Sequence, residues 1–146
     1  VVAHASYAEA GVDISLMATL LYADGRLAQL SCAMDVANHR RATIMGTAGT
    51  IETEYLNHTS DGPGHPWGYL PSELRVRRGT ANSIPFEQVY SATGSGFRFG
   101  AEAFAQVVAT DDTAAVARAA QASIDIAATL EAIAQSAREG REIALG

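Results

Sequence analysis

The sequence predicts an α+β fold: a large, mostly antiparallel open sheet with helices packed on one face. Residues 1–55 and 73–93 contain short runs in which apolar and polar residues alternate, and turn residues separate the runs, a pattern typical of strands. From Phe99 onward the apolar residues recur at helical spacing instead. A stripe of small residues along the last predicted helix permits close packing on a sheet.

Each expected strand is bounded by turn residues or by a change of pattern. The expected strands cover Val1–Ala8, Val12–Tyr22, Leu27–Met34, Arg41–Gly46, Ile51–Tyr55, Glu73–Arg78 and Phe86–Thr93. Arg75 and Arg77 alternate with Val76 as in an edge strand that places charge on its solvent face. Residues 142–145 are expected to return as a short edge strand.

The Asp24-Gly25 pair predicts the best-defined turn, because Asp-Gly between two β-rich runs is typical of a two-residue hairpin loop. Such a loop would place Tyr22 opposite Leu27 and Leu16 opposite Ala33. In this register both faces of the hairpin carry apolar residues, so we expect both faces to be covered.

Two helices are expected near the C-terminus. Residues 99–108 form the first, and Asp111-Asp112-Thr113 ends it and caps the next. The second runs from about 114 to 138, with Gly140 as the residue that terminates it. Its small-residue stripe comprises Val116, Ala120, Ser123, Ala127, Leu130, Ala134 and Ala137.

Composition narrows the classes of function. The chain has 146 residues and a net charge of -6, which indicates one domain and makes nucleic acid an improbable partner. No apolar run approaches the roughly 20 residues of a membrane span, and no signal peptide is visible, so we expect a cytoplasmic location. The single cysteine, Cys32, is expected to be buried in its strand. All ten basic residues are arginine, which excludes lysine chemistry.

The glycine-rich segments do not predict a nucleotide site. Residues 46–50 connect two strands rather than a strand and a helix, and residues 94–100 lack the spacing of the dinucleotide fingerprint. We interpret both as turns. The Val-Val beginning of the chain, already in a β-rich run, suggests that the sequence belongs to a longer protein.

Several polar residues have both a structural and a functional interpretation. Residues 38–41, Asn-His-Arg-Arg, form either a solvated connection or a basic edge for an anionic ligand. His4 lies mid-strand, where a histidine is usually partly buried and hydrogen-bonded. His58 and His65 lie in a long loop, residues 57–72, that gives them no fixed geometry, so we expect no metal site.

An ordered set of segments resembles the C-terminal half of the Gfo/Idh/MocA oxidoreductases. The segments are Tyr22-Ala23-Asp24-Gly25 at a hairpin tip, Ile44-Met45-Gly46-Thr47-Ala48-Gly49-Thr50-Ile51-Glu52, Phe99 to Val108 and Ser136-Ala137-Arg138-Glu139-Gly140-Arg141. The resemblance covers most of residues 12–145. It implies an open sheet with helices on one face, and a homodimer formed through the other face.

The resemblance also implies that an N-terminal Rossmann domain in the same polypeptide binds NAD or NADP. The whole enzyme would act on a sugar, polyol or related small hydroxy compound. The family's glycine fingerprint, its Glu-Lys-Pro lysine and its Asp-x-x-x-His segment do not occur here. We therefore expect no catalytic residue and no cofactor site in this chain, and no activity from it alone. His65, Trp67 and Arg98 are the candidates for the substrate pocket. The alternative is a stand-alone α+β module that binds a ligand or a protein without catalysis.

Overall fold

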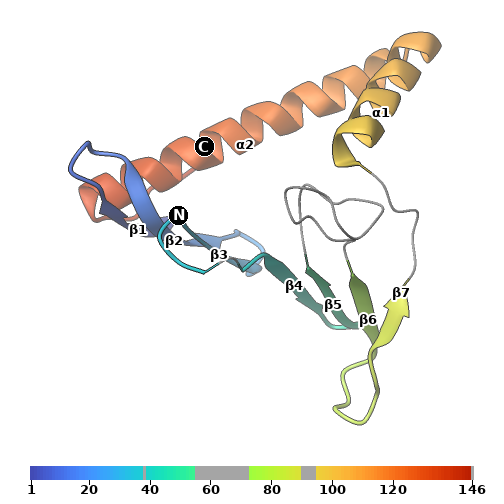
Figure 1. Ribbon diagram of the computed structural model, residues 1–146, viewed down its shortest axis with the longest axis horizontal. Helices are drawn as coiled ribbons and strands as arrows, with labels where there is room; N and C mark the ends of the chain where they lie inside the picture. Colours follow the sequence, from blue (N-terminus) through green and yellow to red (C-terminus); the bar gives the residue numbers. More distant parts are fainter. Residues whose placement is uncertain (38, 55–72, 90–94, 146) are drawn as a thin grey trace. The chain divides into compact units, whose positions relative to one another are not determined.

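A computed structural model describes residues 1–37, 39–54, 73–89 and 95–145 of the chain. These residues form antiparallel strands and two long helices, so the expected α+β class is confirmed (Figure 1). The strands are divided between two sheets, one of three strands and one of four, instead of forming the single large sheet that was expected.

The described elements follow each other in the order predicted from the sequence. They are β1 (Val2–Tyr7), β2 (Asp13–Leu21), β3 (Leu27–Ala33), β4 (Arg41–Gly46), β5 (Gly49–Glu54), β6 (Leu74–Arg78), β7 (Glu87–Val89), α1 (Gly96–Thr110) and α2 (Thr113–Glu139). The chain divides into two compact units, residues 1–37 with 112–146 and residues 38–111. We describe each unit by itself.

In the first unit, β2 lies between β1 and β3, and the turn from β2 to β3 corrects the predicted register. Leu21 pairs with Leu27, one position away from the expected pairing of Tyr22 with Leu27. The Tyr22 N–H donates to the Arg26 carbonyl (3.0 Å), and Gly25 adopts a φ of 85°. The loop therefore has three residues and ends in a left-handed glycine, a common alternative to the two-residue loop.

The corrected register changes which side chains share a face, because a shift of one residue in one strand exchanges the faces of that strand. Leu30 and Cys32 now lie on the same face as Leu16 and Ala18. The opposite face still carries apolar residues, as predicted, but they alternate with polar ones. That face carries Val2, His4, Ser6, Ser15, Met17, Thr19, Leu21, Leu27, Gln29, Ser31 and Ala33.

Helix α2 begins and ends as its sequence predicts. The Asp112 carboxylate accepts the Ala115 N–H (2.8 Å), and Gly140 ends the helix in the left-handed conformation with a φ of 65°. Along the helix, however, the buried residues are Ala132, Ile133 and Ser136. The predicted packing of the whole small-residue stripe is therefore wrong, because Val116 and Leu130 are exposed.

The core of this unit is small and lies between β1, β2 and the last turns of α2 (Figure 1). Its buried side chains are Val1, Ala3, Ala18, Ala132, Ile133 and Ile143, with Leu16, Leu20 and Ala137 packed against them. Because α2 covers β1 and the adjoining part of β2, β3 lies outside this core. Cys32 on β3 is exposed, which corrects its predicted burial.

Ser136 is fully buried and joins three segments of this unit. Its hydroxyl accepts the N–H of Ala3 on β1 (2.9 Å) and donates to the carbonyl of Arg141 after α2 (2.7 Å). Next to it, the backbones of Val1 and Ile143 exchange two hydrogen bonds, of 2.8 and 3.0 Å. Residues 142–145 thus return to the first strand as expected, although they form no regular strand of their own.

In the second unit the strands are ordered β4-β5-β6-β7, and all neighbours are antiparallel. Strand β6 pairs on both sides, so its predicted position at the sheet edge is wrong. The two glycines expected at the turn between β4 and β5, Gly46 and Gly49, pair with each other on either side of it. A side chain at Gly49 would overlap the Arg77 carbonyl oxygen of the neighbouring strand, and this close approach explains the glycine.

We expect Ser136→Ala to lower the free energy of unfolding of the chain by about 1–3 kcal/mol, because it leaves a buried N–H and a buried carbonyl without their partner. Urea unfolding followed by circular dichroism measures the change. Ser123→Ala is the matched control: the exposed Ser123 hydroxyl bonds only to Ala119 of its own helix, so its effect should stay within about 0.5 kcal/mol. Equal unfolding midpoints for the two variants would contradict this role of Ser136.

The turn after β2 generates a prediction about pH. The side chain and the backbone N–H of Arg26 both donate to Asp24 (2.8 and 3.2 Å), and these bonds lower the pKa of that carboxyl. A lowered pKa in the folded chain means that the contribution to stability is present above the pKa of the unfolded chain and is lost as pH falls through the folded value.

We expect Arg26→Gln to raise the pKa of Asp24 toward its ordinary value, which a carbon-detected NMR titration of its carboxyl measures. Glu139 serves as the internal control. Its pKa is lowered first by a hydrogen bond from Gln135 and then by Arg141, and neither group is near the turn in sequence. An unchanged Asp24 titration would show that the contact with Arg26 is absent in solution.

Candidate functional site

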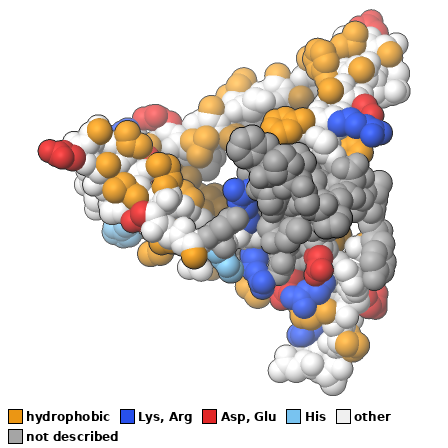
Figure 2. All heavy atoms as spheres, in the orientation of Figure 1, with side chains coloured by type: hydrophobic (Ala, Val, Ile, Leu, Met, Phe, Trp, Pro, Cys, Tyr) orange, Lys and Arg blue, Asp and Glu red, His pale blue; other side chains and the backbone are white. Residues whose placement is uncertain are grey.

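Alternation along the strands of the four-stranded sheet separates charged from apolar side chains. Thr43 of β4 pairs with Glu52 of β5, which pairs with Arg75 of β6, so these three share a face. The opposite face carries Ala42, Ile44, Ile51, Leu74 and Val76. We call the first face, defined by Arg41, Thr43, Glu52, Arg75 and Arg77, the charged face. In Figure 2, arginine and acidic side chains gather in this part of the chain.

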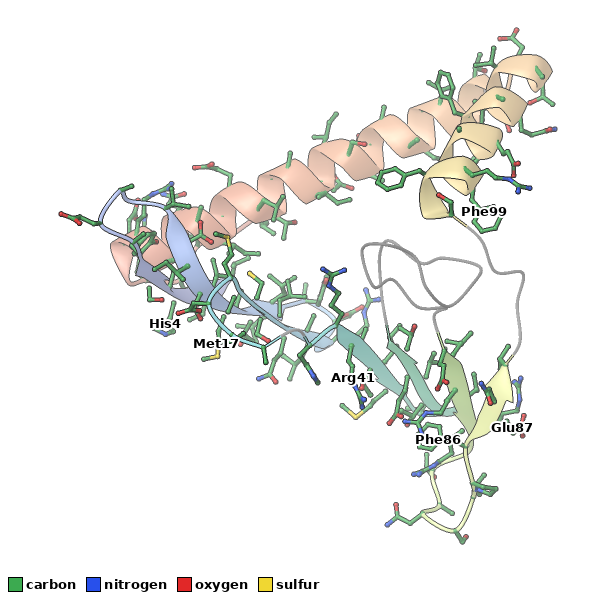
Figure 3. All side chains as sticks on the ribbon, viewed as in Figure 1. His4, Met17, Arg41, Phe86, Glu87 and Phe99 are labelled. Atoms are coloured by element: carbon green, nitrogen blue, oxygen red, sulfur yellow. The ribbon has the colours of Figure 1, made fainter. Side chains whose placement is uncertain are left out.

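A cavity of about 180 Å³ lies at the charged face. Arginine, glutamate and threonine side chains supply most of its lining, and Arg41 stands at its start on β4 (Figure 3). The described lining residues are Arg41, Ala42, Thr43, Glu52, Thr53, Glu73 and Arg75. Donors and acceptors therefore alternate around a small space, an arrangement suited to a ligand with several polar groups.

One ion pair organises this cavity. An Nη of Arg75 donates to Glu52 at 2.6 Å, and the Arg75 guanidinium also lies 5.4 Å from the centre of the Phe86 ring. The two side chains are 46% and 31% exposed, so solvent screens the pair and its contribution to stability is small. The ion pair and the ring contact together orient the Arg75 guanidinium at the cavity.

The three-stranded sheet has a second, more open hollow of about 340 Å³ on its mixed face. His4 and Met17 face each other in the register and project away from α2 (Figure 3). Thr19, Gln29 and Ser31 complete its polar lining. The structure corrects the expectation for His4, which is exposed instead of partly buried.

Of the three predicted pocket residues, the structure describes Arg98 alone, and Arg98 is not among the described lining residues of either hollow. Arg98 lies in the first turn of α1, is 68% exposed, and donates from Nε to Glu102 one helical turn later (2.8 Å). His65 and Trp67 lie outside the described residues. The role of all three in a substrate pocket stays a prediction.

Sequence reasoning missed the charged face because its members come from strands joined by a long connection. Glu52 and Arg75 are 23 residues apart, and nothing local predicts their pairing. The signal was present in two short segments, Glu52-Thr53-Glu54 and Arg75-Val76-Arg77, whose opposite charges alternate with the same period of two. Of the predicted polar segment 38–41, the structure places Arg41 at the cavity.

The described ranges lack the features of two other kinds of site, a metal centre and a membrane span. No group of three or more histidine, cysteine, aspartate or glutamate side chains there could hold a metal ion. Within the same ranges no helix has the length and hydropathy needed to cross a membrane.

Comparison with known proteins identifies the family. The chain matches, over residues 1–145, a family described as an oxidoreductase family, C-terminal alpha/beta domain. Neither the curated proteins nor the solved structures gave a match. Because the match covers nearly the whole chain and the α+β fold agrees with it, the chain belongs to the Gfo/Idh/MocA oxidoreductase family, as its C-terminal α/β domain.

Proposed function

We propose that this chain is the substrate-pocket and dimerisation domain of an NAD(P)-dependent dehydrogenase that acts on a sugar, a polyol or a related small hydroxy compound. The match to the oxidoreductase family over residues 1–145 carries this proposal. In the whole protein, an N-terminal Rossmann domain in cis binds NAD or NADP, which takes up the hydride. The whole protein works in the cytoplasm. The isolated chain is inactive.

The cavity of the charged face supports a hydroxyl-rich substrate. Glutamate oxygens accept hydrogen bonds from hydroxyl groups, while the arginine side chains and the Thr43 hydroxyl donate them. None of the described lining residues is histidine, cysteine or lysine. The chain's part in the reaction is therefore to bind and orient the substrate, with His65, Trp67 and Arg98 as further pocket candidates.

The mixed face of the three-stranded sheet supports the proposed homodimer. Met17, Leu21 and Leu27 are 61, 53 and 68% exposed on that face, and α2 packs on the other face. A twofold contact would bury the same side chains on both subunits. The polar residues among them, such as Thr19 and Gln29, make this a wetter interface than two apolar faces would give.

Because the proposal assigns cofactor binding to the N-terminal domain and substrate binding to this chain, it makes a prediction about NAD and NADP. Titration calorimetry of the 146-residue chain with NAD and with NADP should show no saturable binding, because no described strand-turn-helix segment offers a phosphate cradle. The product of the complete gene, including any sequence before Val1, should bind one of them. Binding by the 146-residue chain, or none by the complete product, would contradict the proposal.

A second prediction concerns the dimer. Met17→Glu should convert a folded dimer into a folded monomer, since it places a charge in the centre of the mixed face. Light scattering measures the mass, and circular dichroism reports the fold.

Met34→Glu is the matched control for Met17→Glu. Met34 is 78% exposed just after β3, and its pairing with Ile14 assigns it to the other face of the sheet. The control should leave the dimer intact. A wild-type chain that stays monomeric at high concentration would contradict an interface on this sheet.

A further inference from the structure

The ring of Phe86 is shared by two positive charges. The guanidinium carbon of Arg77 lies 4.4 Å from the ring centre, and that of Arg75 lies 5.4 Å away. Both distances are within the range of a cation–π interaction. Figure 3 shows Phe86 just before β7, beside the strand that carries both arginines. Two cations held on one ring repel each other unless anions neutralise them.

Only one of these charges has an anionic partner among the residues that the structure describes. Arg75 is paired with Glu52. Arg77 pairs in the register with Thr50, which carries no charge. The Arg77 Nε is buried and has no hydrogen-bond partner in the described part of the chain. The arginine closer to the ring is therefore the one that lacks compensation.

This arrangement is unfavourable as it stands. A buried N–H without an acceptor destabilises the folded chain, and a guanidinium cannot remove this cost by losing its proton. An oxyanion that accepts from Nε and from one Nη together would satisfy both the charge and the orphaned donor, since the guanidinium fork matches carboxylate and phosphate geometry.

We propose that Arg77, held against Phe86, is an oxyanion-binding site for the carboxylate or phosphate group of a small molecule. Arg77 is half-buried as a residue, so part of its side chain is accessible to solvent. The Thr50 hydroxyl on the neighbouring strand is placed to add a donor. The net charge of -6 disfavours an extended polyanion. Arg77 shares the charged face with the cavity described above but is not among the residues that line it, and this proposal does not depend on the proposed function.

The test follows the Nε–H resonance of Arg77 by NMR in the 146-residue chain, with Arg77→Lys to assign it. Sodium phosphate and sodium acetate are titrated separately at constant ionic strength, with chloride as the balancing anion. We expect a saturable shift of the Arg77 signal with at least one of the two probes. Saturation with phosphate alone or with acetate alone identifies which oxyanion the site takes, and either result supports the proposal.

Matched variants test the geometry. Arg77→Gln should weaken binding of the same probe at least about tenfold, and Arg77→Lys should weaken it less, because lysine keeps the charge but loses the fork. Arg138→Gln is the control: Arg138 is exposed and paired with Glu131 at 3.2 Å, and its removal should not change binding. If Arg77→Gln fails to fold, the titration of the wild-type chain with phosphate and acetate still tests whether Arg77 binds an oxyanion.

Three results would overturn the proposal. One is the absence of a saturable shift with both probes. Another is an equal shift of the Arg138 signal, which would indicate a general salt effect. The third is an Arg77 signal that moves with protein concentration instead of with added oxyanion, which would assign the missing acceptor to a second copy of the chain.

Discussion

The first unit depends on the hydroxyl of Ser136, because this one group connects the first strand, the long helix and the chain that follows the helix. A helix interior normally presents apolar groups to a sheet, and the backbone N–H of a strand facing it would have no acceptor. Ser136 supplies that acceptor while it adds almost no bulk. The buried residues around it are small or medium in size, so β1 and α2 pack closely about this hydrogen bond.

Local sequence chemistry predicted the limits of most helices and strands. It could not predict the strand register or the cavity of the charged face, because both depend on pairing between distant residues. Helix α2 begins after Asp112 and ends before Gly140, as expected, and β4 has the predicted limits. The predicted hairpin register was wrong by one residue because Asp-Gly also fits a three-residue loop that ends in a left-handed glycine. The same shift moved Leu30 and Cys32 to the other face. His65 and Trp67 stay untested, whereas the cavity of the charged face combines Arg41, which the sequence offered as part of a basic edge, with Glu52 and Arg75, which nothing local connects.

The charged face shows how a strand in the interior of a sheet accommodates arginine. Arg75 is neutralised by Glu52 on one neighbouring strand and lies near Phe86 on its other side. Arg78, on the opposite face, reaches Glu87 of β7 at 3.5 Å. Arg77 has the ring but no described anion. Three arginines within four positions thus have three different environments, and Arg77 is the one whose charge has no anionic partner among the described residues.

The uneven burial of α2 has a consequence for its dynamics. Side chains 116–128 are all exposed, whereas Ala132, Ile133 and Ser136 are buried. A helix that packs along only its last turns has little tertiary stabilisation at its other end, so that end opens at a lower free energy than the rest. Amide hydrogen exchange should therefore be graded along this single helix, fast near Val116 and slow near Ser136, with no break in the helix itself. Fraying from the far end would leave the small core intact, and the long helix would behave as two segments of different stability.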